Sequence, residues 1–102
     1  MKIKVPKKIQ IGAHTYKIKI DKNLKGDGNR YGEVNYRTQE ITLWGGCNPS
    51  LMMETLLHEV IHIGEFAFRI AISDEDIDRV AETITMLLRN NLDIEFVWDN
   101  IK

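Results

Sequence analysis

The sequence of residues 54–66, ETLLHEVIHIGEF, contains two histidines four positions apart, and a glutamate directly follows the first. These residues are His58, Glu59 and His62. Residues three or four apart are neighbours on one face of an α-helix. Within residues 51–70 most positions are apolar, and the polar side chains at helical spacing are Glu54, His58, His62, Glu65 and Arg69. A helix that is apolar nearly all round is buried, so we expect its one polar stripe to face a cleft, an ion or a partner.

The three residues have the spacing of a zinc site. Histidines four apart on a helix can place both imidazoles on one Zn²⁺ ion. Glu59 lies about 100° around the helix from His58, so it can reach a zinc-bound water without being a ligand. In the H-E-x-x-H pattern the zinc lowers the pKa of that water toward ~7, and the glutamate accepts its proton as the water attacks a carbonyl. The alternative is a pair of histidines with a purely structural role.

The residues before this helix have the period-two pattern of β-strands. In residues 7–21, KKIQIGAHTYKIKID, apolar and polar side chains alternate, and the sequence after Gly12 predicts a turn. Residues 23–30, NLKGDGNR, predict a loop. Residues 31–36 and 40–44 predict the two arms of a hairpin. We therefore expect a small, antiparallel-rich sheet of three to four strands.

Two helices are predicted after the strands. Asn48 can cap the first helix and Pro49 suits its first position, so this helix should cover about residues 49–70. Ser73, followed by several acidic residues, is typical of a helix start. The second helix should therefore cover about residues 74–90.

The chain of 102 residues suits one small domain, residues 1–102. Residues 92–98, LDIEFVW, alternate again and predict a short C-terminal extended segment, so the expected fold class is α+β. The net charge of −1 favours neither nucleic acid nor a membrane surface as a partner. Cys47 is the only cysteine. No internal disulfide can form, and we expect a cytoplasmic location.

The order of strands followed by a helix with TLLHEVIH at residues 55–62 resembles small zinc metallopeptidases of the gluzincin type. It is most similar to the minimal versions of about one hundred residues encoded by phages and archaea, the minigluzincins. This resemblance implies a zincin-like fold, a Zn²⁺ cofactor and a peptide or protein substrate. It also implies that Glu59 is the general base and that a carboxylate on the following helix completes the zinc site. The metzincin pattern is absent, because Glu65 and Phe68 stand three and six positions after His62.

The third zinc ligand is expected on the second helix. Asp78 lies about 120° from the centre of the apolar face of that helix and Glu82 about 160° from it, which favours Asp78 and leaves Glu82 as the alternative. An acid followed three positions later by alanine, as in Asp78 and Ala81, also resembles the family pattern, although the usual acid there is glutamate. Glu65 would need a bent helix to become a ligand, so we expect it to support the site or to pair with Arg69. The acids at 74–76 are expected to be a solvated helix start.

Further roles follow from the peptidase interpretation. Four side chains could stabilise an oxyanion: His14, Tyr31, Tyr36 and Arg69. The strand at 40–44, EITLW, is expected to be an exposed edge that pairs with the substrate backbone, with Trp44 either in the core or at the rim of the cleft. The apolar tail, residues 93–102, either adds a strand to the sheet, covers the cleft or contacts a second copy. The oligomeric state stays open.

The alternative function is a zincin-like binding or regulatory protein, phage-derived, that keeps the scaffold without useful turnover. About one hundred residues leave little material for substrate pockets. Both readings share the zinc site and differ in whether Glu59 activates a water.

Overall fold

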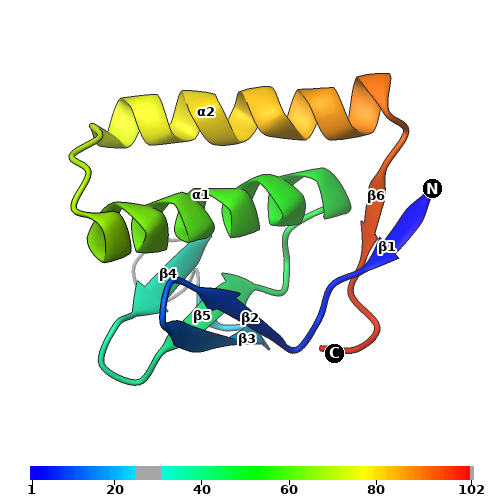
Figure 1. Ribbon diagram of the computed structural model, residues 1–102. Coiled ribbons are helices and arrows are strands. Elements are labelled where there is room, and N and C mark those ends of the chain that lie inside the picture. The colour runs from blue at the N-terminus through cyan, green and yellow to red at the C-terminus, as the bar shows by residue number, and fades with distance from the viewer. Residues whose placement is uncertain (25–30, 102) are drawn as a thin grey trace.

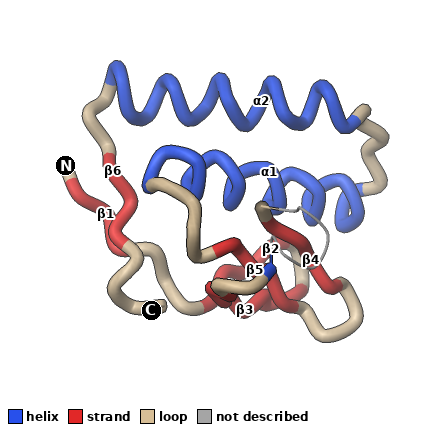
Figure 2. The backbone as a smooth tube through the Cα atoms, turned by 180° about the vertical axis from the view of Figure 1, so that it is seen from behind, coloured by secondary structure: helices blue, strands red, loops and turns tan. Residues whose placement is uncertain are grey.

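The computed structural model describes residues 1–24 and 31–101, and in it the helix with the two histidines is the middle layer. This helix, α1 (Pro49–Phe68), lies between a β-sheet and the second helix, α2 (Asp74–Met86), as Figure 1 shows. The two helices run in opposite directions because only a short connection joins them. Seen from behind, the same three layers appear in the same order (Figure 2). The middle position explains why α1 is apolar on most sides.

The main sheet has four strands in the order β2 (Lys8–Ile11), β3 (His14–Asp21), β5 (Glu40–Trp44) and β4 (Gly32–Asn35). The pairs β2–β3 and β4–β5 are antiparallel hairpins, as the sequence predicts. The central pair β3–β5 is parallel, with Ile18 opposite Ile41. The α+β class is therefore confirmed, but the sheet is mixed. The sheet is mixed because the two antiparallel hairpins meet at β3 and β5, which are parallel.

The exposed edge beside α1 is β4, so the expectation that residues 40–44 form this edge was wrong. The chain turns back after β4, and β5 enters the space between β4 and β3. Both sides of the β5 backbone are then used in strand pairing, and no side remains for a substrate. Among the described strands β4 pairs with β5 and stands at the end of the strand order, and it contacts α1.

The core lies between the sheet and α1. Tyr16 and Ile18 point inward from β3 while Lys17 is exposed, which is the alternation expected of a strand with one buried face. The inward side chains of β5 and α1 complete the cluster: Ile41, Leu43, Met52, Leu56 and Ile63. Burying each such side chain stabilises the fold by about 1.5–3 kcal/mol before entropy is counted.

The start of α1 follows the sequence signals. The side chain of Asn48 accepts a hydrogen bond from the Leu51 amide at 2.9 Å, and Pro49 occupies the first turn. The helix ends at Phe68, because Arg69 adopts a left-handed conformation with φ of 56°. The expectation of burial nearly all round fails here, since Phe66 and Phe68 are each 61% exposed. The cover over this last turn is partial: Phe66 stacks on Tyr36, with ring centroids 4.5 Å apart.

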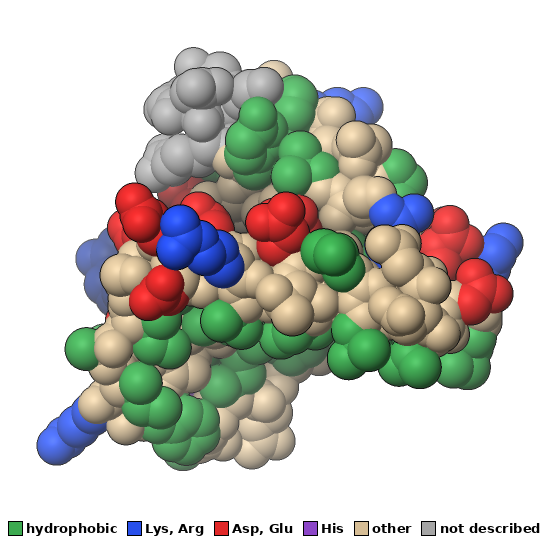
Figure 3. Space-filling view, turned by 90° about the horizontal axis from the view of Figure 1, so that it is seen from above, with side chains coloured by type: hydrophobic (Ala, Val, Ile, Leu, Met, Phe, Trp, Pro, Cys, Tyr) green, Lys and Arg blue, Asp and Glu red, His purple; other side chains and the backbone are tan. Residues whose placement is uncertain are grey.

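The helix α2 begins at the predicted cap, where Ser73 Oγ accepts a hydrogen bond from the Asp76 amide at 3.2 Å. Its regular part continues into one turn of π-helix, η2 (Leu87–Asn91), so the helical stretch ends close to the predicted residue 90. The buried side chains Ile77 and Ala81 face α1. Acidic side chains gather over the N-terminal part of α2 (Figure 3).

The two ends of the described chain pair with each other. Strand β1 (Lys2–Lys4) and strand β6 (Glu95–Val97) form a separate parallel sheet of two strands, so β6 does not join the main sheet. Trp98, directly after β6, is buried in the core. No helix within residues 1–24 and 31–101 combines the length and the apolar character that crossing a membrane requires.

Candidate metal centre

The two histidines of α1 converge through the same ring atom. His58 Nε2 and His62 Nε2 are 3.0 Å apart, and the ring centroids are separated by 4.7 Å. Two nitrogens that bind one tetrahedral zinc at 2.0–2.1 Å would be about 3.3 Å apart. A carboxylate oxygen of Glu59 completes a group whose ligand atoms all lie within 4.8 Å of one another. The two histidines, which the sequence places on one face of the helix, thus lie together, and Glu59, expected about 100° away around the helix, has an oxygen within the same group.

The other nitrogen of each ring faces a carboxylate. His58 Nδ1 lies 2.7 Å from Asp78 Oδ1, and His62 Nδ1 lies 3.4 Å from Glu65 Oε1. A neutral imidazole carries one N–H group. If that hydrogen sits on Nδ1 and points at the carboxylate, Nε2 presents a lone pair. Both Nε2 atoms then present lone pairs to each other at 3.0 Å, an arrangement that a cation between them would stabilise.

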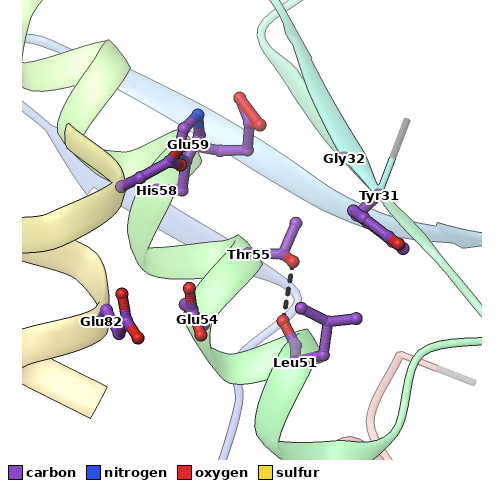
Figure 4. Close-up of a pocket in the computed structure, with 9 residues that line it drawn as sticks. Tyr31, Gly32, Leu51, Glu54, Thr55, His58, Glu59 and Glu82 are labelled. Atoms are coloured by element: carbon purple, nitrogen blue, oxygen red, sulfur yellow. Dashed lines mark hydrogen bonds and ion pairs between the residues drawn. The ribbon is translucent and has the colours of Figure 1, made fainter. Parts of the chain in front are cut away.

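Glu59 is almost completely buried, with 6% of its surface exposed. Burial raises the pKa of its carboxyl group, and the neighbouring His58 and His62 partly oppose this rise. Its carboxylate accepts no hydrogen bond from the residues that the structure describes. The side chain lines a cavity of about 460 Å³ at the N-terminal half of α1 (Figure 4). A carboxylate in this position can hold a proton at a higher pH than an exposed one.

The edge strand β4 approaches α1 very closely at Gly32. A Cβ atom added there would lie 2.6 Å from Thr55 Cγ2 and 3.4 Å from Glu59 Oε2. Thr55 is fixed by a hydrogen bond from its Oγ1 to the Leu51 carbonyl at 2.7 Å (Figure 4). Only glycine fits this contact without a shift. The sequence did not single out Gly32, which lies second in the first arm of the predicted hairpin and opens the observed strand β4.

The acids of α2 occupy three different positions around the histidines. Asp78 contacts the ring nitrogen of His58 that faces away from His62. Glu82 lines the cavity. Asp74 Oδ1 lies 4.0 Å from His62 Nε2, although the Asp74 side chain is 89% exposed. The role of Asp78 as third ligand stays a prediction. Asp74 is exposed, as expected for a solvated helix start, but it shares one face of α2 with Asp78 because the two are four residues apart, and the sequence did not indicate its closeness to His62.

Glu65 supports the site from the end of α1. Its Oε1 lies near His62 Nδ1, and its Oε2 accepts a hydrogen bond from the Ile72 amide at 2.7 Å. One carboxylate thus connects a histidine ring to the segment that leads into α2. This is the supporting role expected from the sequence, while Arg69 closes the helix.

The four oxyanion candidates lie in different places. Tyr31 lines the cavity. The Tyr36 hydroxyl donates a long hydrogen bond, 3.4 Å, to the His62 carbonyl, and burial followed by the nearby Glu59 charge raises the Tyr36 pKa. His14 starts β3 and contacts Gln39, and Arg69 ends α1. The structure therefore brings the two tyrosines to the site and leaves the other two away from the cavity.

The C-terminal tail and Trp44 do not line the cavity. Residues 95–101 run beside β1 and end in a turn, with Trp98 in the core. Trp44 donates a hydrogen bond from Nε1 to the Lys22 carbonyl at 3.0 Å, and its ring lies 5.9 Å from that of Tyr31. Trp44 thus stands directly behind a cavity residue. Contact of the tail with a second copy stays a prediction.

None of the protein-family models, curated proteins or solved structures compared with this chain matches it significantly. The resemblance to gluzincin-type peptidases therefore stays a prediction that residues 55–62 carry. The chemistry of the centre is inferred from its own side chains.

Proposed function

We propose that this protein is a zinc-dependent metalloendopeptidase. The observation that carries the proposal is the convergence of His58 Nε2 and His62 Nε2 at 3.0 Å, with a carboxylate on the far nitrogen of each ring. Carboxylate–histidine pairs of this kind fix the tautomer and the ring orientation that metal binding requires. The buried Glu59 beside them has the position of a general base.

The zinc ligands in this proposal are His58, His62 and one acid from α2. The sequence favours Asp78 as that acid, with Glu82 as the alternative. The 2.7 Å contact of Asp78 with His58 Nδ1 supports a different role, in which Asp78 orients the ring. Asp74, one turn earlier and 4.0 Å from His62 Nε2, is then the acid best placed to become the third ligand. Its exposed side chain is free to turn toward the histidines.

A bound zinc would polarise the substrate carbonyl and acidify the attacking water. Glu59 would accept a proton from the attacking water and return it to the leaving amine. Burial raises the Glu59 pKa, which brings the carboxyl closer to the working pH of a general acid–base group. The hydroxyls of Tyr31 and Tyr36 are candidates to stabilise the oxyanion.

Zinc content and the effect of Glu59→Gln test this function. Protein purified without chelators should contain about one zinc per chain by elemental analysis and should cleave members of a peptide library. Glu59→Gln should keep the zinc and lose cleavage, whereas Glu75→Gln, at an 83% exposed side chain on α2, should change neither. Zinc without cleavage in the wild type would favour a zincin-like binding or regulatory protein. Absence of stoichiometric zinc would leave a structural histidine pair.

The proposal includes a cytoplasmic location. The single cysteine, Cys47, is half-buried and packs against the core. A lone thiol of this kind suits a reducing compartment. The cofactor is Zn²⁺ and the partner is a peptide or protein substrate.

A further inference from the structure

The cavity beside Glu59 has acidic walls. Its volume is about 460 Å³, which lies within the range of ligand sites in proteins. Among the described residues, no lysine or arginine lines it. The lining includes four carboxylates, Glu54, Glu59, Asp78 and Glu82. Its other residues are Tyr31, Gly32, Leu51, Thr55 and the proposed zinc ligand His58.

Two of these carboxylates, Glu54 and Glu82, have no role in the zinc chemistry when Asp74 is the third ligand. Asp78 contacts His58, and Glu59 is the general base. Glu54 on α1 and Glu82 on α2 remain, and Figure 4 shows both carboxylates in the gap between the two helices. Neither of them makes a hydrogen bond or an ion pair with a described residue. Partial burial, followed by the charges of Glu82 and Asp78, raises the pKa of Glu54.

The third carboxylate that opens into the cavity is buried. Glu59 is 6% exposed, and no described residue donates a hydrogen bond to it. On the side of the cavity between the helices, the charges of Glu82 and Asp78 act on Glu54. Carboxylates placed together in this way repel one another, and a cation among them lowers their energy. The cavity therefore favours a positively charged group over a neutral or negative one.

The other walls indicate what kind of cation fits. Tyr31 and Leu51 offer apolar surface next to the acids. Lysine and arginine side chains combine a long apolar stem with a charged end. Such a side chain can lay its stem against Tyr31 and Leu51 and place its charge between Glu54 and Glu82.

We propose that this cavity is a specificity pocket for a lysine or arginine side chain of the peptide substrate, next to the bond that is cut. Glu54 and Glu82 bind the cationic end. This inference rests on the proposed peptidase function. It adds the class of substrate: extended segments with a basic residue at one fixed position.

A pair of dipeptide hydroxamates tests the pocket without requiring turnover. The two compounds differ only in one side chain, lysine or norleucine, which has a similar stem without the charge. Isothermal titration calorimetry with the zinc-loaded protein should show about tenfold tighter binding of the lysine compound, as for a charge-assisted hydrogen bond that is partly screened. Glu54→Gln and Glu82→Gln should each reduce this ratio, and the double variant should bring it near one.

The matched control is Glu75→Gln, which removes one negative charge from the outer face of α2 and should leave the ratio unchanged. Circular dichroism of each variant should match the wild type. Equal or better binding of the norleucine compound would overturn the pocket while the zinc chemistry stands. The titration is repeated with millimolar Ca²⁺ or Mg²⁺ at constant ionic strength. If the divalent cation abolishes the preference for lysine and monovalent salt does not, Glu54 and Glu82 bind a second metal instead. If neither compound binds and elemental analysis finds no zinc, the peptidase function itself fails.

Discussion

Replacing Asp78 by alanine separates the two roles that this acid could have at the zinc centre. The variant removes a carboxylate whose Oδ1 lies 2.7 Å from His58 Nδ1. A hydrogen bond to a charged group contributes about 1.5–3 kcal/mol. The Asp78 side chain is 66% exposed, and solvent screening reduces the expected loss to the lower end, about 1–1.5 kcal/mol. We therefore expect about a tenfold weaker zinc affinity, the lower end of typical effects for residues that orient a ligand.

Loss of a true ligand would cost much more. Structural zinc sites in small proteins bind with about 10–16 kcal/mol, or roughly 3 kcal/mol for each of four ligands. An alanine at a ligand position should therefore weaken zinc binding by about a hundredfold or more. Asp74→Ala should fall into this class, because Asp74 is the acid nearest His62 Nε2.

Competition with a chromophoric chelator at pH 7.5 measures both affinities. The control is Asp76→Ala, whose carboxylate makes only a 3.8 Å ion pair with Arg79 on the surface of α2. Asp78→Asn should lose less affinity than Asp78→Ala, because its amide oxygen can still accept the His58 hydrogen. A larger loss for Asp78→Ala than for Asp74→Ala would refute this reasoning and return Asp78 to the ligand position that the sequence favours.

Two further predictions concern the walls of the cavity. Gly32→Ala places a Cβ 2.6 Å from Thr55 Cγ2, so we expect about 1–3 kcal/mol of destabilisation and a melting temperature lower by about 4–8 °C per kcal/mol. An unchanged melting curve would contradict the close approach of β4 to α1. The pKa of Glu54 is higher in the folded than in the unfolded protein. Between these two pKa values the folded protein binds more protons, so the free energy of unfolding falls as the pH rises through this interval. In the metal-free protein Glu54→Gln should therefore raise the melting temperature at pH 7.5 and change it little at pH 3.5. Equal changes in melting temperature at the two pH values would contradict a raised Glu54 pKa.

The helix starts and the hairpins could be predicted from the sequence because they depend on residues close together in the chain. Asn48 and Pro49 start α1, and Ser73 starts α2, through contacts with residues at most three positions away. The hairpin of β4 and β5 follows from alternation on both sides of a short turn. The convergence of His58 and His62 follows from helical spacing alone.

The remaining features depend on residues far apart in the chain. The parallel pairing of β3 with β5 places Ile18 opposite Ile41, and the alternation of each strand fits either direction of pairing. The same limit hid the edge position of β4. The nitrogen of His58 that Asp78 contacts is set by how α2 crosses α1, and a helical wheel contains no information on that crossing. The exposure of Phe66 likewise depends on where the sheet ends beneath α1.

The pairing of β1 with β6 sets an order for folding during synthesis. Lys2 pairs with Glu95, so residues 2–4 lack their partner until more than ninety further residues have been added, roughly 5–20 s at ordinary rates of translation. Both helices with the histidines and acids emerge from the ribosome before β6 does. The centre can therefore assemble while the core still lacks Trp98, and the pairing of β1 with β6 comes after it. A nascent chain interrupted before residue 95 would carry every proposed zinc ligand but would lack strand β6, the partner of β1.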